Sequence, residues 1–168
     1  EVRFYETAVA ANNYYNKMMN NGALYVAGID DLSKIHTALG ITTQTSSDGT
    51  YVTYSNDGTT NDPQLYYSTN FLKNMQTAPY LIFKYRAENT VSSGFYYKCQ
   101  IGGKWFDFAA TDDWSYCLVE IANTDKIQDS TAFRFDVFES NTIGKSIDIA
   151  EVRFYDNRVS AEAYVDNW

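Results

Sequence analysis

The sequence predicts an all-β fold, an antiparallel β-sandwich of the jelly-roll type with one or two short helices near the N-terminus. Three observations point to it. Short segments of alternating apolar and polar residues recur along the chain, separated by turn clusters. The chain of 168 residues contains only two prolines and is rich in aromatic residues that suit strands, with 15 Tyr and 10 Phe. Helices and strands do not alternate regularly, which argues against a parallel sheet.

Size and charge narrow the functional classes. A chain of this length fits one domain and removes roughly 70% of its unfolded surface from water on folding. The net charge of −8 argues against binding to nucleic acids or anionic membranes, both of which attract basic surfaces. No apolar run of about 18 residues that could span a membrane is present. Abundant Asn, Thr and Ser are typical of an extracellular β protein rich in loops.

The end of the chain repeats its beginning. Residues 1–18 read EVRFYETAVAANNYYNKM, and residues 151–168 read EVRFYDNRVSAEAYVDNW. The separation of 150 positions is about the size of one domain, so we expect a module from a tandem array. Residues 1–20 are then the last strand and helical tail of a preceding repeat, and residues 21–168 are the β-sandwich module.

Helices are expected only near the N-terminus and after the last strand. Residues 1–5 alternate as a strand, and residues 7–20 have helical spacing. The sequence Asn20–Asn21–Gly22 ends this helix. Residues 30–39 predict a second short helix, capped by an aspartate and ended by a glycine.

Strands follow from alternation and turn chemistry. The pair FYYKCQI and KWFDF, joined by Gly102 and Gly103, predicts a hairpin. The turn cluster NDGTTND precedes another strand. Strands are expected at residues 50–54, 64–68, 80–86, 95–101, 104–108, 114–121, 133–138 and 147–155. Cys99 and Cys117 lie in two of these strands, where they either form a disulfide or are separate buried residues.

The second half of the chain resembles a known family. The segments YLIFKYRAEN, WSYCLVEIA, FRFDVF and SIDIAEVRFYDNRVSAEAYV follow the layout of galactose-binding-like β-sandwich domains. These are similar to carbohydrate-binding modules of large secreted proteins from Gram-positive gut bacteria. The resemblance implies a jelly roll that binds glycans or serves as a spacer, with a structural calcium in many members. It also implies that Trp114 packs inward at the start of a strand.

Aromatic residues are the first candidates for a binding site. Sugars have flat apolar faces edged by hydroxyls, which stack on exposed rings and bond to neighbouring polar groups. Trp105 stands beside the predicted hairpin turn, and one of any two successive strand residues faces away from the core. Packing in the core is the alternative for each ring. The ligand-binding candidates are Tyr66, Tyr96, Tyr97 and Trp105, with Arg86 and Asp112 as polar candidates.

An acidic turn suggests a calcium site. Calcium prefers several oxygen ligands, and Asp57, Asn61 and Asp62 cluster in one turn. The resemblance adds Glu151, which stands near the start of the last strand. Ordinary turn chemistry explains the same residues without a metal. The spacing matches no EF-hand loop.

Catalysis is not expected. His36 is the single histidine, and no serine lies in a GxSxG motif. Asp136 and Asp148, in apolar strands, are expected to form structural ion pairs with Arg134 and Arg153 on neighbouring strands. The sequence therefore predicts a non-catalytic, secreted or surface-attached module that binds glycan through exposed aromatics. The alternatives are a spacer in a tandem-repeat surface protein and a calcium-stabilised protein-binding module.

Overall fold

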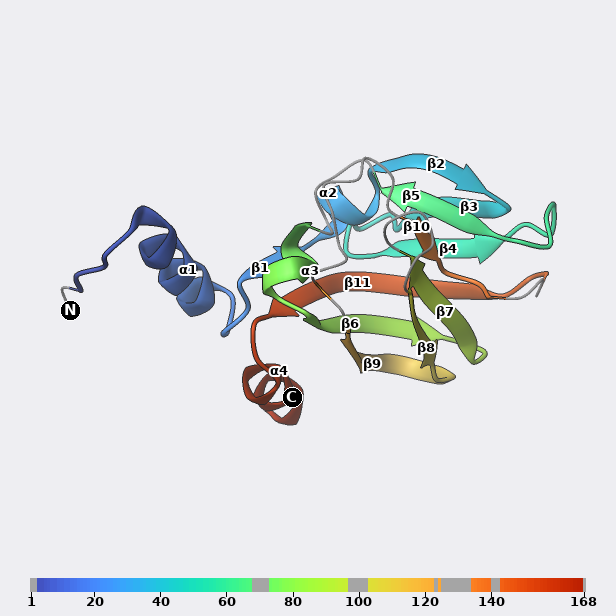
Figure 1. Ribbon diagram of the computed structural model, residues 1–168. Helices are drawn as coiled ribbons and strands as arrows, with labels where there is room; N and C mark the ends of the chain where they lie inside the picture. The colour runs from blue at the N-terminus through green and yellow to red at the C-terminus, as the bar shows by residue number, and fades with distance from the viewer. Residues whose placement is uncertain are drawn as a thin grey trace.

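Two antiparallel sheets form the body of the molecule (Figure 1). The computed structural model describes residues 3–67, 73–96, 103–122, 124, 134–139 and 143–167. Sheet A has the strand order β3-β4-β11-β6-β9, and β1 also pairs with β11. Its strands are β1 (Tyr25–Ala27), β3 (Ile41–Thr45), β4 (Val52–Asn56), β6 (Tyr80–Ala87), β9 (Thr111–Glu120) and β11 (Ser146–Tyr155).

Sheet B has the order β2-β5-β10-β7-β8. Its strands are β2 (Ile35–Leu39), β5 (Gln64–Tyr67), β7 (Val91–Tyr96), β8 (Gly103–Phe108) and β10 (Arg134–Asp136). β7 and β8 pair antiparallel as the predicted hairpin requires, but the predicted turn was wrong, because Gly103 lies in β8 opposite Tyr96 and β7 begins at Val91, four residues before the predicted strand. The two-layered sandwich predicted from alternation is therefore the observed architecture.

Side-chain alternation builds the core between the sheets. In β11, Ile147, Ile149, Val152 and Phe154 are buried, and a bulge between Ile149 and Glu151 keeps the apolar residues facing inward on both sides of it. Phenylalanines fill the centre: the rings of Phe95 and Phe135 stack at 4.6 Å. Much of the aromatic content predicted for strands thus serves packing.

A pair of tyrosines closes the core near β4. The Tyr54 hydroxyl donates to the Leu32 carbonyl at 2.8 Å and lies 2.9 Å from the Tyr67 hydroxyl. Both rings are buried, and this burial raises both tyrosine pKa values. Because each hydroxyl has a partner, the polar atoms are buried without an unsatisfied bond.

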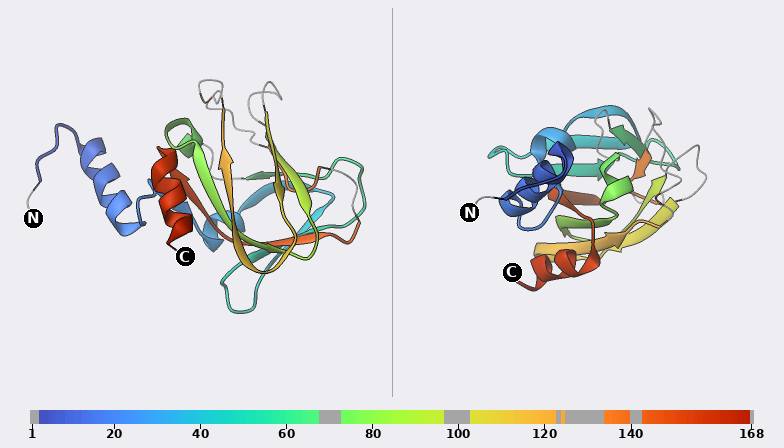
Figure 2. Two further views of the ribbon diagram at one scale, coloured as in Figure 1. Left: turned by 90° about the horizontal axis from the view of Figure 1, so that it is seen from below. Right: turned by 60° about the vertical axis from the view of Figure 1, so that its left-hand side comes forward.

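Helix α4 (Arg158–Asp166) packs on the outside of sheet A, as the predicted tail helix (Figure 2). Its Ala161 and Tyr164 form a second apolar cluster with Ile82 of β6 and Tyr155 of β11. Helix α1 (Ala8–Met19) extends away from the sandwich (Figure 1). The remaining helices are α2 (Ile29–Leu32) and α3 (Lys73–Thr77). No helix in the described part of the chain is both long and apolar enough to cross a membrane.

Several sequence predictions were wrong in detail. The helix expected at residues 30–39 is limited to α2, because the following residues pair as β2 with β5. The sequence also predicted no strand at β3, which follows β2. Residues 3–5 form no strand, since no neighbouring strand pairs with them. Strand β9 begins at Thr111, three residues before the predicted start at Trp114, and its pairing with β6 shifts register between Tyr85 and Ala87.

Candidate functional site

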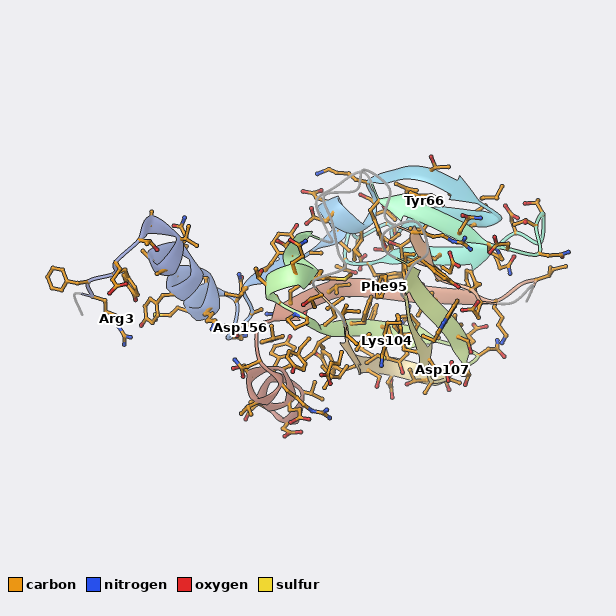
Figure 3. All side chains as sticks on the ribbon, viewed as in Figure 1. Arg3, Tyr66, Phe95, Lys104, Asp107 and Asp156 are labelled. Atoms are coloured by element: carbon orange, nitrogen blue, oxygen red, sulfur yellow. The ribbon has the colours of Figure 1, made fainter. Side chains whose placement is uncertain are left out.

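The outer face of sheet B collects aromatic and charged side chains from four strands. The strand register places Tyr66, Arg134 and Tyr96 in one row. Asp136, Gly94 and Trp105 form the next row. Phe135 and Phe95 between them face the core, so these rows face outward. Figure 3 labels Tyr66 and Asp107 of the same sheet. We call this surface the sheet B face.

Trp105 is the most exposed aromatic residue of the sheet B face, with 47% of its surface accessible. Its indole lies against the backbone of Gly94, where an added Cβ would stand 2.4 Å from ring atom Cζ3. Tyr96 meets the same indole edge-on, with ring centres 4.8 Å apart. Gly94 therefore allows the indole to lie against the sheet, with part of its surface in solvent.

An arginine with two carboxylates forms the polar centre. Arg134 donates from Nε and Nη2 to the two oxygens of Asp136, at 2.6 and 2.7 Å. Nη2 also donates to Asp62 at 2.5 Å. The guanidinium stacks over the Tyr96 ring, 4.8 Å from its centre. Such a fork of bonds holds Arg134 and the ring in fixed positions.

The electrostatics of the centre favour a neutral ligand. Asp62, Asp136 and Glu139 surround a single guanidinium, which leaves an excess of negative charge. Burial raises the pKa of the Asp136 carboxyl, although the bonds from Arg134 oppose the rise. Burial, followed by the charges of Glu139 and Asp136, raises the pKa of Tyr96 to about 12. The face thus suits hydroxyl donors and repels anions.

A pocket of about 330 Å³ lies beside Trp105. Within it, the Ser92 hydroxyl donates to Asp107 Oδ1 at 2.5 Å. Its lining residues are Ser92, Ser93, Trp105, Phe106, Asp107 and Glu139. Carboxylate oxygens next to an exposed ring form the combination that sugar hydroxyls and sugar faces require.

Neither a family model nor a curated protein matches the sequence. Solved structures do match. A lysine-to-alanine variant of the carbohydrate-binding module CBM29-2 aligns with a TM-score of 0.52 at 9% identity, over 74% of this chain and 84% of its own. A CBM29-2 variant complexed with cellulohexaose gives 0.51 at 13% identity, over 77% and 90%. One complexed with mannohexaose gives 0.50 at 11% identity, over 72% and 81%.

The chain has the fold of these family 29 modules. The predicted β-sandwich and its likeness to carbohydrate-binding modules are thereby confirmed. Of the predicted ligand residues, the structure brings Tyr66, Tyr96 and Trp105 together on the sheet B face. Tyr97 lies outside the described residues.

Arg86 and Asp112 lie on the other sheet. Arg86 donates to Asp148 at 2.6 Å and lies beside the rings of Tyr51 and Trp114, 5.3 and 5.0 Å from their centres. Together with Asp112 and Asp148 it lines a pocket of about 280 Å³. These residues are not part of the sheet B face. Trp114 is 36% exposed on the outside of sheet A, so the inward packing implied by the resemblance was wrong.

The ion pairs differ from those expected. Asp148 pairs with Arg86 of β6, whereas Arg153 pairs with Glu151 of its own strand at 2.8 Å. Arg134 pairs with Asp136, two residues along the same strand. Arg134 and Arg153 each pair with a carboxylate two residues away on the same face of their own strand, whereas Arg86 and Asp148 stand opposite each other on neighbouring strands.

The structure does not bring the predicted calcium ligands together. Asp57 accepts bonds from Thr59 N and Oγ1, which lower its pKa. Asp62 pairs with Arg134, and Glu151 pairs with Arg153 on sheet A. Among the described residues, no three His, Cys, Asp or Glu side chains are grouped to hold a metal. The guanidinium beside Asp62 opposes a cation there.

Cys117 carries a free thiol on β9, and burial raises its pKa to about 11. The Cys117 side chain is half-buried, and Cys99 lies outside the described residues. Sequence reasoning missed Gly94, Asp107 and Glu139 as parts of the sheet B face. Alternation in FRFDVF could have placed Arg134 and Asp136 on one face, but not beside Asp62.

Proposed function

We propose that this chain is a non-catalytic carbohydrate-binding module that binds a neutral glycan across the sheet B face. The observation that supports this most directly is the exposed Trp105 indole, supported by Gly94 and Tyr96, next to the Arg134–Asp136 centre. The fold shared with modules solved with cellulohexaose and mannohexaose supports the same class of ligand.

The geometry indicates how a sugar would be held. One pyranose ring stacks on the solvent-exposed part of Trp105, which removes apolar CH groups from water. Its hydroxyls donate to Asp107 and Glu139 in the adjoining pocket. Arg134 is already fixed by Asp136, so little side-chain entropy is lost on binding. Chains of neutral sugars fit because the surrounding carboxylates repel acidic ones.

The two exposed tryptophans provide a matched test. We expect Trp105→Ala to weaken binding to cellohexaose or mannohexaose at least ten-fold, about 1.4 kcal/mol, because the stacking surface is lost. Trp114→Ala, on sheet A, should bind like the wild type. Isothermal titration calorimetry measures both, and thermal melts confirm that both variants fold. Equal losses for the two variants, or none for Trp105→Ala, would contradict the proposed site.

The second candidate function is a spacer in a tandem-repeat protein at the cell surface or in the medium. The repeat of EVRFY at both ends of the chain favours it. A glycan array separates the two functions. A spacer should bind none of the glycans on the array. Retention of any neutral glycan, lost in Trp105→Ala, supports the binding module.

A structural calcium remains a proposal, limited to the turn at residues 56–62. Asp57 and Asn61 supply its oxygens, together with backbone carbonyls. If the ion stabilises the fold, chelation should lower Tm and added calcium should restore it, in a way that Asp57→Asn abolishes. An unchanged melt in chelator would dismiss the proposal.

A further inference from the structure

The two copies of the repeated segment make the same contacts. Arg3 lies over the ring of Tyr14, 4.3 Å from its centre, and Arg153 lies over Tyr164 at 4.4 Å. These residues correspond exactly by position, each pair 150 residues apart in the sequence. The cation–π contact therefore belongs to the segment itself and not to its surroundings.

The helix caps and the ring pairs also correspond. Thr7 Oγ1 accepts from the Ala10 N–H at 3.1 Å, as Asn157 Oδ1 accepts from Ser160 at 2.9 Å. The capping residues differ, but both types cap helices well. The rings of Tyr5 and Tyr14 are 5.5 Å apart, and those of Tyr155 and Tyr164 are 6.3 Å apart. Each copy is thus a short segment, in β11 for the C-terminal copy and outside any strand for the N-terminal one, followed by a capped helix that folds back on it.

The copies differ in what covers them. Phe154 is 0% exposed in the core, whereas its counterpart Phe4 is 94% exposed. Tyr155 is also buried, but Tyr5 is exposed. The N-terminal copy therefore has the side chains of a unit that packs on a sheet, without a sheet beneath it (Figure 3 labels Arg3).

The end of α1 contacts the corner where β11 meets α4. Lys17 Nζ pairs with Asp156 at 2.6 Å, and Arg153 Nη1 donates to the Asn20 carbonyl at 2.9 Å. The chain then turns through Asn21 and Gly22, both with positive φ, and Gly22 lies against Tyr155. Figure 3 labels Asp156 at this junction.

We propose that residues 3–19 are the terminal strand and helix of a preceding copy of this module, and that the β11–α4 corner docks the end of that copy's helix. Phe4 and Tyr5 are then covered by the preceding copy's sheet A, as Phe154 and Tyr155 are covered here. Docking through Arg153 and Asp156 fixes the orientation of successive modules. The inference is independent of glycan binding.

A segment exchange tests the equivalence of the copies. In the full chain, residues 151–168 are replaced by a second copy of residues 1–18. We expect a cooperative melt within about 10 °C of the wild type, since the strand is identical and a cap is retained. Phe154→Asp in the exchanged chain should abolish that melt, whereas Phe4→Asp in the wild type should not shift it. Failure of the exchanged chain to fold, or indifference to Phe154→Asp, overturns the equivalence.

Backbone NMR relaxation tests the docking. In the wild-type chain, α1 and β11 amides should share order parameters near 0.85, because α1 moves with the sandwich. Gly22→Val places a β-branched residue at a φ of +88°, and should lower the α1 values while leaving β11 unchanged. Order parameters below about 0.6 throughout α1 in the wild type would overturn the docking.

Discussion

At the scale of single residues, Arg134 connects stability and the proposed binding. Its guanidinium joins Asp136 and Asp62 and supports Tyr96, so the positions of three side chains depend on one cation. Asp136 is only 2% exposed. A buried charge that loses its partner costs far more than a pair replaced as a whole.

Removing Asp136 alone and replacing Asp136 together with Arg134 should therefore change the stability of the fold by different amounts. We expect Asp136→Ala to lower the free energy of unfolding by about 3 kcal/mol, because Arg134 keeps its charge without its buried carboxylate. The double variant Arg134→Met with Asp136→Leu should recover most of this loss. Denaturant unfolding of the three chains measures it. A double variant less stable than Asp136→Ala would show that the pair itself stabilises the fold.

At the scale of elements, α1 and α4 share a capped beginning but differ in packing. Helix α4 lies on sheet A through Ala161 and Tyr164, while α1 contacts the sandwich near its end. Loss of a cap affects global stability only if the helix unfolds together with the core.

The two caps give a matched pair of variants. Asn157→Ala should lower the free energy of unfolding by about 1 kcal/mol, which corresponds to about 2–4 °C in Tm. Thr7→Ala should leave the Tm of the sandwich unchanged and reduce only the helical signal of α1. Circular dichroism melts follow both. An equal loss in Tm from Thr7→Ala would mean that α1 unfolds with the core.

Two elements, the β7–β8 hairpin and the helix expected at residues 30–39, show what local sequence can and cannot predict. The alternation in KWFDF correctly predicted strand β8, which carries Trp105, but Gly103, expected in the turn, pairs within that strand. The helix expected from Asp30 was wrong beyond Leu32, because β5 pairs with the following residues and local spacing does not register that neighbour. Arg86 was predicted as a ligand-binding residue without a sheet assignment; it lies on sheet A beside Asp148, a partner distant in sequence that local patterns do not reveal.

At the scale of the whole molecule, buried tyrosines limit stability at high pH. Burial raises the pKa of Tyr155 to about 12, and with the Asp31 charge that of Tyr25 to about 12. Burial raises the pKa values of Tyr54 and Tyr67 further. Since the folded pKa values exceed the unfolded value near 10, stability is complete below pH 10 and falls as pH rises toward 12.

Unfolding at alkaline pH should reflect the raised pKa values of these tyrosines. We expect the free energy of unfolding to be nearly constant from pH 8 to about 9.5 and to fall steeply above about pH 10. Denaturant titrations at each pH, with tyrosinate absorbance as a second signal, measure it. Tyrosinate absorbance that develops fully near pH 10 without loss of structure would contradict the burial of these hydroxyls.

The placement of α4 on sheet A leaves the sheet B face, the proposed ligand surface, on the opposite layer. In a chain with several copies joined at the β11–α4 corner, helices and junctions would occupy one layer, and each copy would keep its tryptophan accessible. A long polysaccharide could then be engaged at several points at once. Linked weak sites of this kind can raise the overall affinity by about 10²–10⁴ without any additional contact.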